Sequence, residues 1–260
     1  MSRIMSHLKV ENLSISFGGL KALSGVTFAV KKGEIYSIIG PNGAGKTTVF
    51  NCISGIYKPS YGKIFFKDLD ITPFKPYQVA ESGIARTFQN IELFAHMTTM
   101  DNLMLGRHTK LKTGVWAGAT FLTAHSKAAR DEIQNRQVVE EIIDFLELQA
   151  SRNQFVVNLP YGTQKLVELG RALALEPEVL LLDEPSAGMN LEEKENLIFS
   201  IRDIRDDFGI TVLLVEHDMN LVMGISDRIL ALNYGQVIAE GIPQEVQKHP
   251  EVLKAYLGEG

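Results

Sequence analysis

The stretch Gly40–Thr48, which reads Gly-Pro-Asn-Gly-Ala-Gly-Lys-Thr-Thr, leaves this chain few possible folds. It fits the phosphate-binding loop pattern: a Gly, four arbitrary residues, then Gly-Lys and Ser or Thr. Gly43 and Gly45 can adopt backbone angles closed to other residues, so consecutive amides can turn inward around one anion. We expect Lys46 to reach the β and γ phosphates and the Thr47 hydroxyl to ligate Mg²⁺. The predicted nucleotide-binding residues here are Gly40, Pro41, Asn42, Gly43, Ala44, Gly45, Lys46, Thr47 and Thr48.

The residues on either side of this loop supply the strand and the helix that it needs. An apolar, β-branched run over residues 34–39 precedes it, and residues 47–53 can form a helix directly after it. The N-terminus of that helix adds partial positive charge and free N–H groups to the same anion site. These flanks weigh against the alternative, a chance match in a glycine-rich turn.

The composition is that of an ordinary soluble globular protein. The chain has 260 residues, 45% hydrophobic and 22% charged, which is enough for one large or two small domains. The net charge of -5 argues against a nucleic-acid binder that relies on a basic face. The single cysteine, Cys52, excludes an internal disulfide and is expected to be a small core residue. The sequence shows neither a secretory signal nor a run of about 18 apolar residues, so no membrane span is expected.

Short apolar or alternating runs predict β-structure around the loop. Residues 8–17 and 26–30 predict strands of an antiparallel sheet, residues 62–67 a further strand and residues 76–82 a short helix. Phe17 lies just before a Gly-Gly turn and could stack on an adenine ring. An aromatic residue at such a position is, however, more often part of the core.

Helical patterning between residues 100 and 148 predicts a helical subdomain, from Gln89 to about Ala174. It is inserted in an α/β core formed by residues 1–88 and 175–260. An uncharged stretch, residues 113–122, carries the only tryptophan, Trp116, and is too short to span a bilayer. It is either packed on its own subdomain or a surface that meets a membrane-embedded partner.

Two predicted buried strands in the last third of the chain end in polar residues. Residues 179–182 lead into Asp183-Glu184, and residues 210–215 lead into Glu216-His217. With a phosphate loop in the same chain, we expect Asp183 to hold Mg²⁺ and Glu184 to orient and deprotonate the attacking water; the alternative is a solvated turn. His217 is expected to contact the γ-phosphate. The remaining histidines are expected to be solvated: His7, His96, His108, His125 and His249.

An amphipathic helix over residues 191–208, a hairpin over residues 227–241 and two short helices complete the predicted elements.

In this order the motifs resemble the ATP-binding subunits of ABC transporters over essentially the whole chain. The resemblance makes Phe17 the adenine platform, residues 40–48 Walker A, Gln89 the Q-loop, residues 159–163 the signature, residues 179–184 Walker B, residues 186–190 the D-loop and His217 the switch histidine. It implies an α/β fold: a P-loop NTPase-type core with a mixed central sheet, an antiparallel β subdomain and an inserted helical subdomain. It also implies ATP and Mg²⁺ as cofactors, with Thr47, Gln89 and Asp183 at the metal and Glu184, His217 and Gln89 as the catalytic residues.

In that family the signature of one subunit caps the ATP held by Walker A of the other, so the active unit is a head-to-tail dimer. Tyr161, Gly162 and Thr163 are therefore expected to contact a partner's nucleotide. More narrowly, the chain looks like an ATPase subunit of the branched-chain, or hydrophobic, amino acid importer. The residues that carry this likeness are 40–54, 86–93, 216–228 and 255–259.

Such importers use two different ATPase subunits, two permease subunits and an external binding protein, although a homodimer of this chain stays open as an alternative. The resemblance thus implies a peripheral protein at the cytoplasmic face of the inner membrane, with no nucleic-acid partner.

Three positions depart from the family pattern. Pro160 stands where the signature usually has Ser, Thr163 where it has Gln, and Asn190 where many relatives have Asp. These departures concern the contact with a partner's nucleotide, and every element of the chain's own site is present.

Other functional classes stay open at this stage. They are a soluble ABC-type ATPase acting on DNA or ribosomes, a regulatory subunit that binds ATP while its partner hydrolyses it, a urea or amide importer, and an exporter of lipid-linked material.

Overall fold

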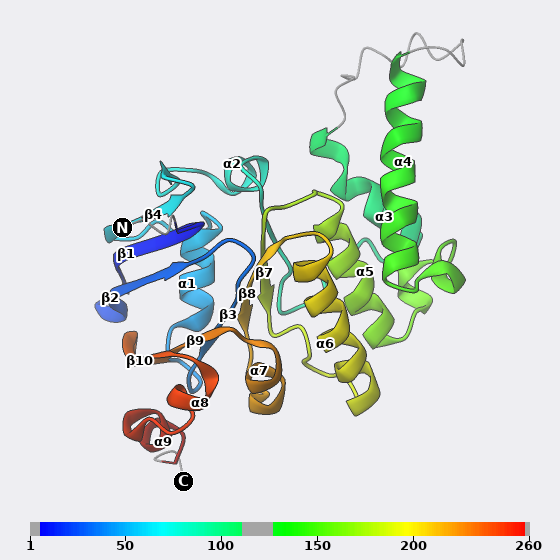
Figure 1. Cartoon of the computed structure of the whole chain (residues 1–260). Helices are drawn as coiled ribbons and strands as arrows, with labels where there is room; N and C mark the ends of the chain where they lie inside the picture. The colour runs from blue at the N-terminus through cyan, green and yellow to red at the C-terminus, as the bar shows by residue number, and fades with distance from the viewer. Residues whose placement is uncertain (1–5, 111–126, 258–260) are drawn as a thin grey trace. The chain divides into compact units, whose positions relative to one another are not determined.

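The structure of the chain is a computed structural model that describes residues 6–110 and 127–257 (Figure 1). These residues form two compact units, one within residues 1–89 and 178–260 and the other within residues 90–177. The stretch around Trp116, His125 and the last three residues lie outside the described part. Among the helices that are described, none combines the length and the apolar character needed to cross a membrane.

The first unit is built on a six-stranded mixed sheet with the order β10-β9-β3-β8-β7-β6. All neighbouring strands are parallel except β10, which is antiparallel to β9. Every residue of β3, β7 and β8 is buried, as expected for strands covered on both faces. Because β3, β8 and β7 are parallel neighbours, their carboxyl ends lie along one edge of the sheet. The six strands are β3 (Ile35–Ile39), β6 (Ile84–Arg86), β7 (Val179–Asp183), β8 (Thr211–Val215), β9 (Arg228–Asn233) and β10 (Gln236–Gly241).

A second, antiparallel sheet has the order β2-β1-β4-β5. One apolar core joins this sheet to α1 (Lys46–Ile53) and to one face of the mixed sheet (Figure 1). Leu13 and Val26 come from the antiparallel sheet, Phe50 from α1, and Ile38 and Leu213 from the mixed sheet. The strands are β1 (Leu8–Phe17), β2 (Leu20–Val30), β4 (Tyr61–Phe66) and β5 (Leu69–Asp70), and α2 (Pro76–Glu81) follows them.

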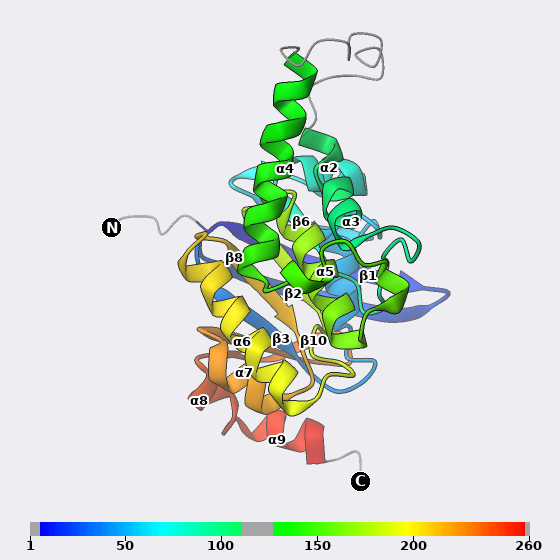
Figure 2. The same ribbon diagram turned by 90° about the vertical axis from the view of Figure 1, so that its right-hand side faces the viewer.

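Three short helices cover the opposite face of the mixed sheet: α7 (Met219–Ile225), α8 (Pro243–Val246) and α9 (Pro250–Leu257). Ile39 packs there with Val222 of α7 and Val246 of α8, whereas its neighbour Ile38 belongs to the core on the α1 side. Successive strand residues point to opposite faces, so β3 is anchored from both sides. The longer helix α6 (Leu191–Asp206) packs beside α7 (Figure 2).

The second unit is mostly helical. Its main helices are α3 (Thr99–Gly106), α4 (Lys127–Phe145) and α5 (Tyr161–Leu173), joined by the short 3₁₀ turns η1 (His108–Lys110), η3 (Gln149–Ser151) and η4 (Val156–Asn158). A Cβ at Gly170 of α5 would lie 3.1 to 3.3 Å from Leu146, Ile142 and Leu103. The three helices therefore approach closely at a position that suits a residue without a side chain.

The predicted α/β class, with a mixed sheet, an antiparallel sheet and helices, is confirmed. The helix α7 and the strands β5 and β6 were not predicted from the sequence. These strands have two and three residues, which is too short for a periodic pattern to show.

The prediction that His7 is solvated is wrong, although His96 and His108 are exposed as expected. His7 is 4% exposed, and its Nδ1 lies 2.7 Å from the Thr211 hydroxyl. Its backbone continues the antiparallel sheet, because its N–H donates to Val30 and its carbonyl accepts from Lys67. Burial lowers the pKa of the His7 imidazole.

Candidate functional site

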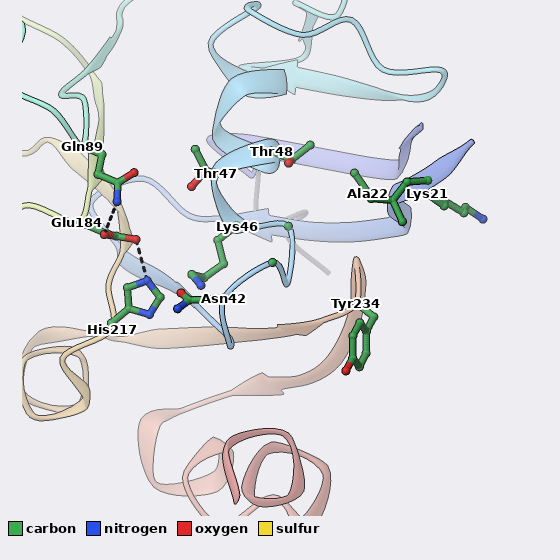
Figure 3. A pocket seen from close by; sticks show the side chains of 13 residues that line it. Lys21, Ala22, Asn42, Lys46, Thr47, Thr48, Gln89, Glu184, His217 and Tyr234 are labelled. Atoms are coloured by element: carbon green, nitrogen blue, oxygen red, sulfur yellow. Dashed lines mark hydrogen bonds and ion pairs between the residues drawn. The ribbon is translucent and has the colours of Figure 1, made fainter. Parts of the chain in front are cut away.

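A cavity of about 510 Å³ lies where the loops after β3, β7 and β8 meet (Figure 3). Nine of the residues that line it were predicted from the sequence to be site residues, and the other four were not. The first group is Asn42, Gly43, Gly45, Lys46, Thr47, Thr48, Gln89, Glu184 and His217, and the second is Leu20, Lys21, Ala22 and Tyr234.

The loop between β3 and α1 has the expected backbone. Gly43 and Gly45 have φ angles of 78° and 104°, in the left-handed region that favours glycine. A Cβ on Gly45 would also lie 2.9 Å from the carbonyl oxygen of Ala22. The residue before α1 is Gly45, so no side chain accepts hydrogen bonds from the first amides of the helix. The amides in the first turn of a helix have no acceptor within the helix itself. This helix end is therefore suited to bind an anion.

The Lys46 ammonium is held by the loop that precedes it. Its Nζ donates to the carbonyl of Gly40 at 2.7 Å and to that of Pro41 at 3.0 Å, and the residue is 5% exposed. These contacts fix the position of a positive charge beside the N-terminus of α1.

The Glu184 carboxylate lies between two other predicted residues (Figure 3). One oxygen accepts a hydrogen bond from Gln89 Nε2 at 2.8 Å, and the other lies 2.7 Å from His217 Nε2. The backbone of Glu184 has a φ of 49°, an uncommon conformation for a residue with a side chain, and its N–H donates to Val215 at 2.8 Å. The end of β8 thus holds the turn after β7 and directs the carboxylate into the cavity.

The buried carboxylate of Glu216, for which the sequence analysis predicted no role, holds the loops around Glu184. Glu216, 2% exposed, accepts from the backbone N–H of Ser186 at 2.8 Å and from that of His217 at 2.9 Å. It therefore ties the segment after Glu184 to the segment that carries His217.

Asp183 is the last residue of β7 and is 1% exposed. Its Oδ2 pairs with Arg86 Nη2 at 2.8 Å, while Oδ1 is buried and has no hydrogen-bond partner among the described residues. Burial raises the pKa of the carboxyl, and the Arg86 guanidinium opposes that shift. An unsatisfied carboxylate oxygen, together with the Thr47 hydroxyl that lines the cavity, is a donor set that suits Mg²⁺ or its bound water. The residues present fit this ion.

Arg86, another residue without an assigned role in the sequence reading, joins this aspartate to α1. Its Nη1 donates to Asn51 Oδ1 at 2.7 Å and to Ser54 Oγ at 2.9 Å. Its guanidinium carbon lies 5.7 Å from the ring centroid of Phe50 and 5.1 Å from that of Phe88. The guanidinium connects the helix after the phosphate loop to the end of β7.

We expect Arg86→Gln to lower the free energy of unfolding by about 3 kcal/mol, because it leaves Asp183 buried without its charge partner. The double variant Arg86→Gln, Asp183→Asn should lose less stability than the sum of the two single variants. Urea unfolding followed by circular dichroism measures both effects. The control is Arg205→Gln, which breaks a partly exposed pair with Asp206 and a longer one with Asp227 and should cost less than about 1 kcal/mol. Additive single-variant losses would contradict the coupling.

The remaining predicted residues lie elsewhere. Phe17 is 44% exposed rather than in the core; its ring packs edge-on against Tyr57 at 5.1 Å, and it does not line the cavity. Four more predicted residues are buried and do not line the cavity: Gly40, Pro41, Ala44 and Asp183. Tyr161, Gly162 and Thr163 form the first turn of α5 in the second unit, after Pro160, which makes no side-chain cap.

The departure at Asn190 has a local structural role. Its side-chain oxygen accepts from the Glu193 N–H at 2.9 Å, and the Glu193 carboxylate accepts from the Asn190 N–H at 2.8 Å. This reciprocal pair is a capping box that starts α6.

Two family models match the chain. One, described as ABC transporter, matches residues 23–187, and the other, described as branched-chain amino acid ATP-binding cassette transporter, matches residues 236–260. The chain is 43% identical over 252 residues to the high-affinity branched-chain amino acid transport ATP-binding protein LivG of Salmonella typhimurium, covering 97% of this chain and 98% of that protein.

Solved structures of ATP-binding cassettes have a similar fold. An ATP-binding cassette of an ABC transporter in its ADP conformation is 32% identical, with a TM-score of 0.84 over 98% of this chain and 99% of that one. A dimeric ATP-binding cassette in a post-hydrolysis state, bound to ADP and Pi, is 25% identical, with a TM-score of 0.73 over 91% of this chain and 98% of that one.

Proposed function

Because the chain belongs to the ATP-binding subunits of ABC transporters, we propose that it hydrolyses Mg·ATP to drive the import of branched-chain or other hydrophobic amino acids. The observation that carries the catalytic part is the Glu184 carboxylate, held by Gln89 and His217 in the cavity that Lys46 and Thr47 also line. A regulatory subunit that only binds nucleotide has no need of such a group.

In this proposal Glu184 acts as the general base. Each carboxylate oxygen has a second lone pair, so the group can accept a hydrogen bond from water while Gln89 and His217 keep it oriented. As the water oxygen attacks the γ-phosphorus, its proton passes to Glu184. The bond from the γ-phosphorus to the bridging oxygen breaks, and ADP leaves with that electron pair.

The other cavity residues stabilise the charge that this reaction moves. Lys46 carries a fixed positive charge with three N–H donors, and the N-terminus of α1 adds its amides to the phosphate site. Thr47, Asp183 and Gln89 would hold Mg²⁺, which neutralises charge on the β and γ phosphates. His217 would contact the γ-phosphate from the end of β8.

We propose that the working unit is a head-to-tail dimer on the cytoplasmic face of the membrane, bound to two permease subunits. The dimeric cassette of similar fold supports this assembly. The first turn of α5, with Tyr161, Gly162 and Thr163, would present its free amides to the partner's nucleotide. Because Pro160 and Thr163 replace two polar residues of the usual signature, we propose that the partner is a different ATPase subunit that carries the more usual sequence.

Two observations support branched-chain amino acids as the substrate class: the similarity of the chain to LivG and the family match of residues 236–260. The deciding experiment reconstitutes this chain with its partner ATPase and permease in lipid vesicles, with the external binding protein inside. Leucine, isoleucine or valine on the binding-protein side should stimulate ATP hydrolysis severalfold, and urea should not. Stimulation by urea or amides alone would assign the chain to the other importer class, and hydrolysis that does not respond to any solute would contradict a role in import.

A further inference from the structure

The structure assigns a second aromatic residue, Tyr234, to the nucleotide site: we propose that its ring packs against the base of the bound nucleoside triphosphate. This inference rests on the proposed function, since it concerns the same cavity. It adds a hairpin residue to the base contact that the family resemblance implies for Phe17.

The direction of the nucleotide in the cavity follows from the residues at its two ends. Gln89, Glu184 and His217 lie together on one side, and Lys21, Ala22 and Tyr234 lie on the other, with Lys46 and Thr47 between them (Figure 3). If the γ-phosphate lies at Glu184 and the β-phosphate at Lys46, the chain of atoms continues through the α-phosphate and ribose toward Tyr234. The base must then lie at this end.

The surface at this end suits a flat, partly apolar group. Tyr234 is 84% exposed and Leu20 is 74% exposed, and both line the cavity with Ala22. Within residues 6–110 and 127–257, the Tyr234 side chain has no hydrogen bond or ring contact. Its ring can therefore stack on a base without losing a hydrogen bond or a ring contact to the protein. Phe17 differs, because it already packs against Tyr57 and does not line the cavity.

The backbone conformation at Tyr234 also favours a binding role for its side chain. Tyr234 and Gly235 are the two turn residues between β9 and β10, with φ angles of 44° and 73°. Turns of this kind favour Asn, Asp or Gly at both positions, because the left-handed region is costly for a bulky side chain. A tyrosine here is strained and exposed, and strained residues are enriched at binding sites.

The hairpin tip is also fixed against the phosphate loop. The Gly235 N–H donates to the carbonyl of Ala44 at 3.0 Å, and the Gly235 carbonyl accepts from Ser24 at 2.8 Å. The tip is thus joined to the loop on one side and to β2 on the other. The backbone that carries Tyr234 is therefore held beside the phosphate loop, as a base-binding position requires.

The test is equilibrium binding of ATP and of inorganic tripolyphosphate, each with Mg²⁺, to the full chain and to three variants. We expect Tyr234→Ala to weaken ATP binding about tenfold and to leave tripolyphosphate binding unchanged. Tyr234→Phe, which keeps the ring, should bind ATP like the unmodified chain. Phe17→Ala is the matched aromatic control and should have a smaller effect on ATP than Tyr234→Ala.

Three results would overturn the inference. They are unchanged ATP binding by Tyr234→Ala, an equal loss of ATP and tripolyphosphate binding in that variant, and an ATP loss that Tyr234→Phe does not restore. Failure of the unmodified chain to bind ATP is a different outcome, because it would contradict the proposed function itself. Thermal melts of all variants show whether the hairpin keeps its fold.

Discussion

Glu184→Gln is expected to lower the rate of ATP hydrolysis at least about a hundredfold while leaving the affinity for ATP nearly unchanged. Gln has the shape of Glu and can still meet Gln89 and His217, but its amide cannot accept the proton of the attacking water. ATP should then stay bound, and dimers should persist in size-exclusion chromatography with Mg·ATP. Single-turnover phosphate release measures the chemical step directly.

Glu195→Gln is the matched control for this variant. It also removes one carboxylate from the first unit, at an exposed position of α6, and should hydrolyse ATP at the normal rate. If Glu184→Gln hydrolyses ATP at a near-normal rate, the base lies elsewhere, and His217 becomes the first candidate.

Lys46→Ala is expected to weaken ATP binding about tenfold to a hundredfold and to reduce turnover further. It removes a positive charge held beside the phosphate site by Gly40 and Pro41, and hydrogen bonds to charged groups contribute roughly 1.5 to 3 kcal/mol each. Competition binding with ATP, ADP and adenosine shows whether the loss of affinity comes from the contacts to the phosphates. Affinity should fall most for ATP and least for adenosine, which carries no phosphate.

Lys248→Ala, an exposed lysine near the C-terminus, is the control and should bind all three ligands normally. A Lys46→Ala variant that hydrolyses ATP at the original rate would show that the ammonium has no part in the reaction. An equal loss for adenosine and ATP would point instead to a damaged fold.

The parts of the site that depend on local backbone geometry could be predicted from the amino-acid sequence alone. The glycine spacing of residues 40–48, with a buried strand before it and a helix after it, predicted the backbone that Gly43 and Gly45 adopt. The apolar runs ending at Asp183 and Val215 predicted two buried strands, and parallel strands place their carboxyl ends at one edge of a sheet. A local pattern of residues is enough for such features, because neighbours in the chain fix them.

The contacts between side chains that are distant in the chain could not be predicted in this way, because they depend on the fold. Glu184 contacts Gln89 and His217, which are 95 and 33 positions away in the chain, and Arg86 pairs with Asp183 across 97 positions. These contacts depend on the strand order β3-β8-β7-β6, which no periodic pattern encodes. The same holds for Tyr234 and Phe17. The family resemblance implied that Phe17 is the base platform. In the fold, the Gly235 N–H donates to Ala44 and the Gly235 carbonyl accepts from Ser24, and Tyr234 lines the cavity because the sheet places the β9–β10 turn beside the phosphate loop.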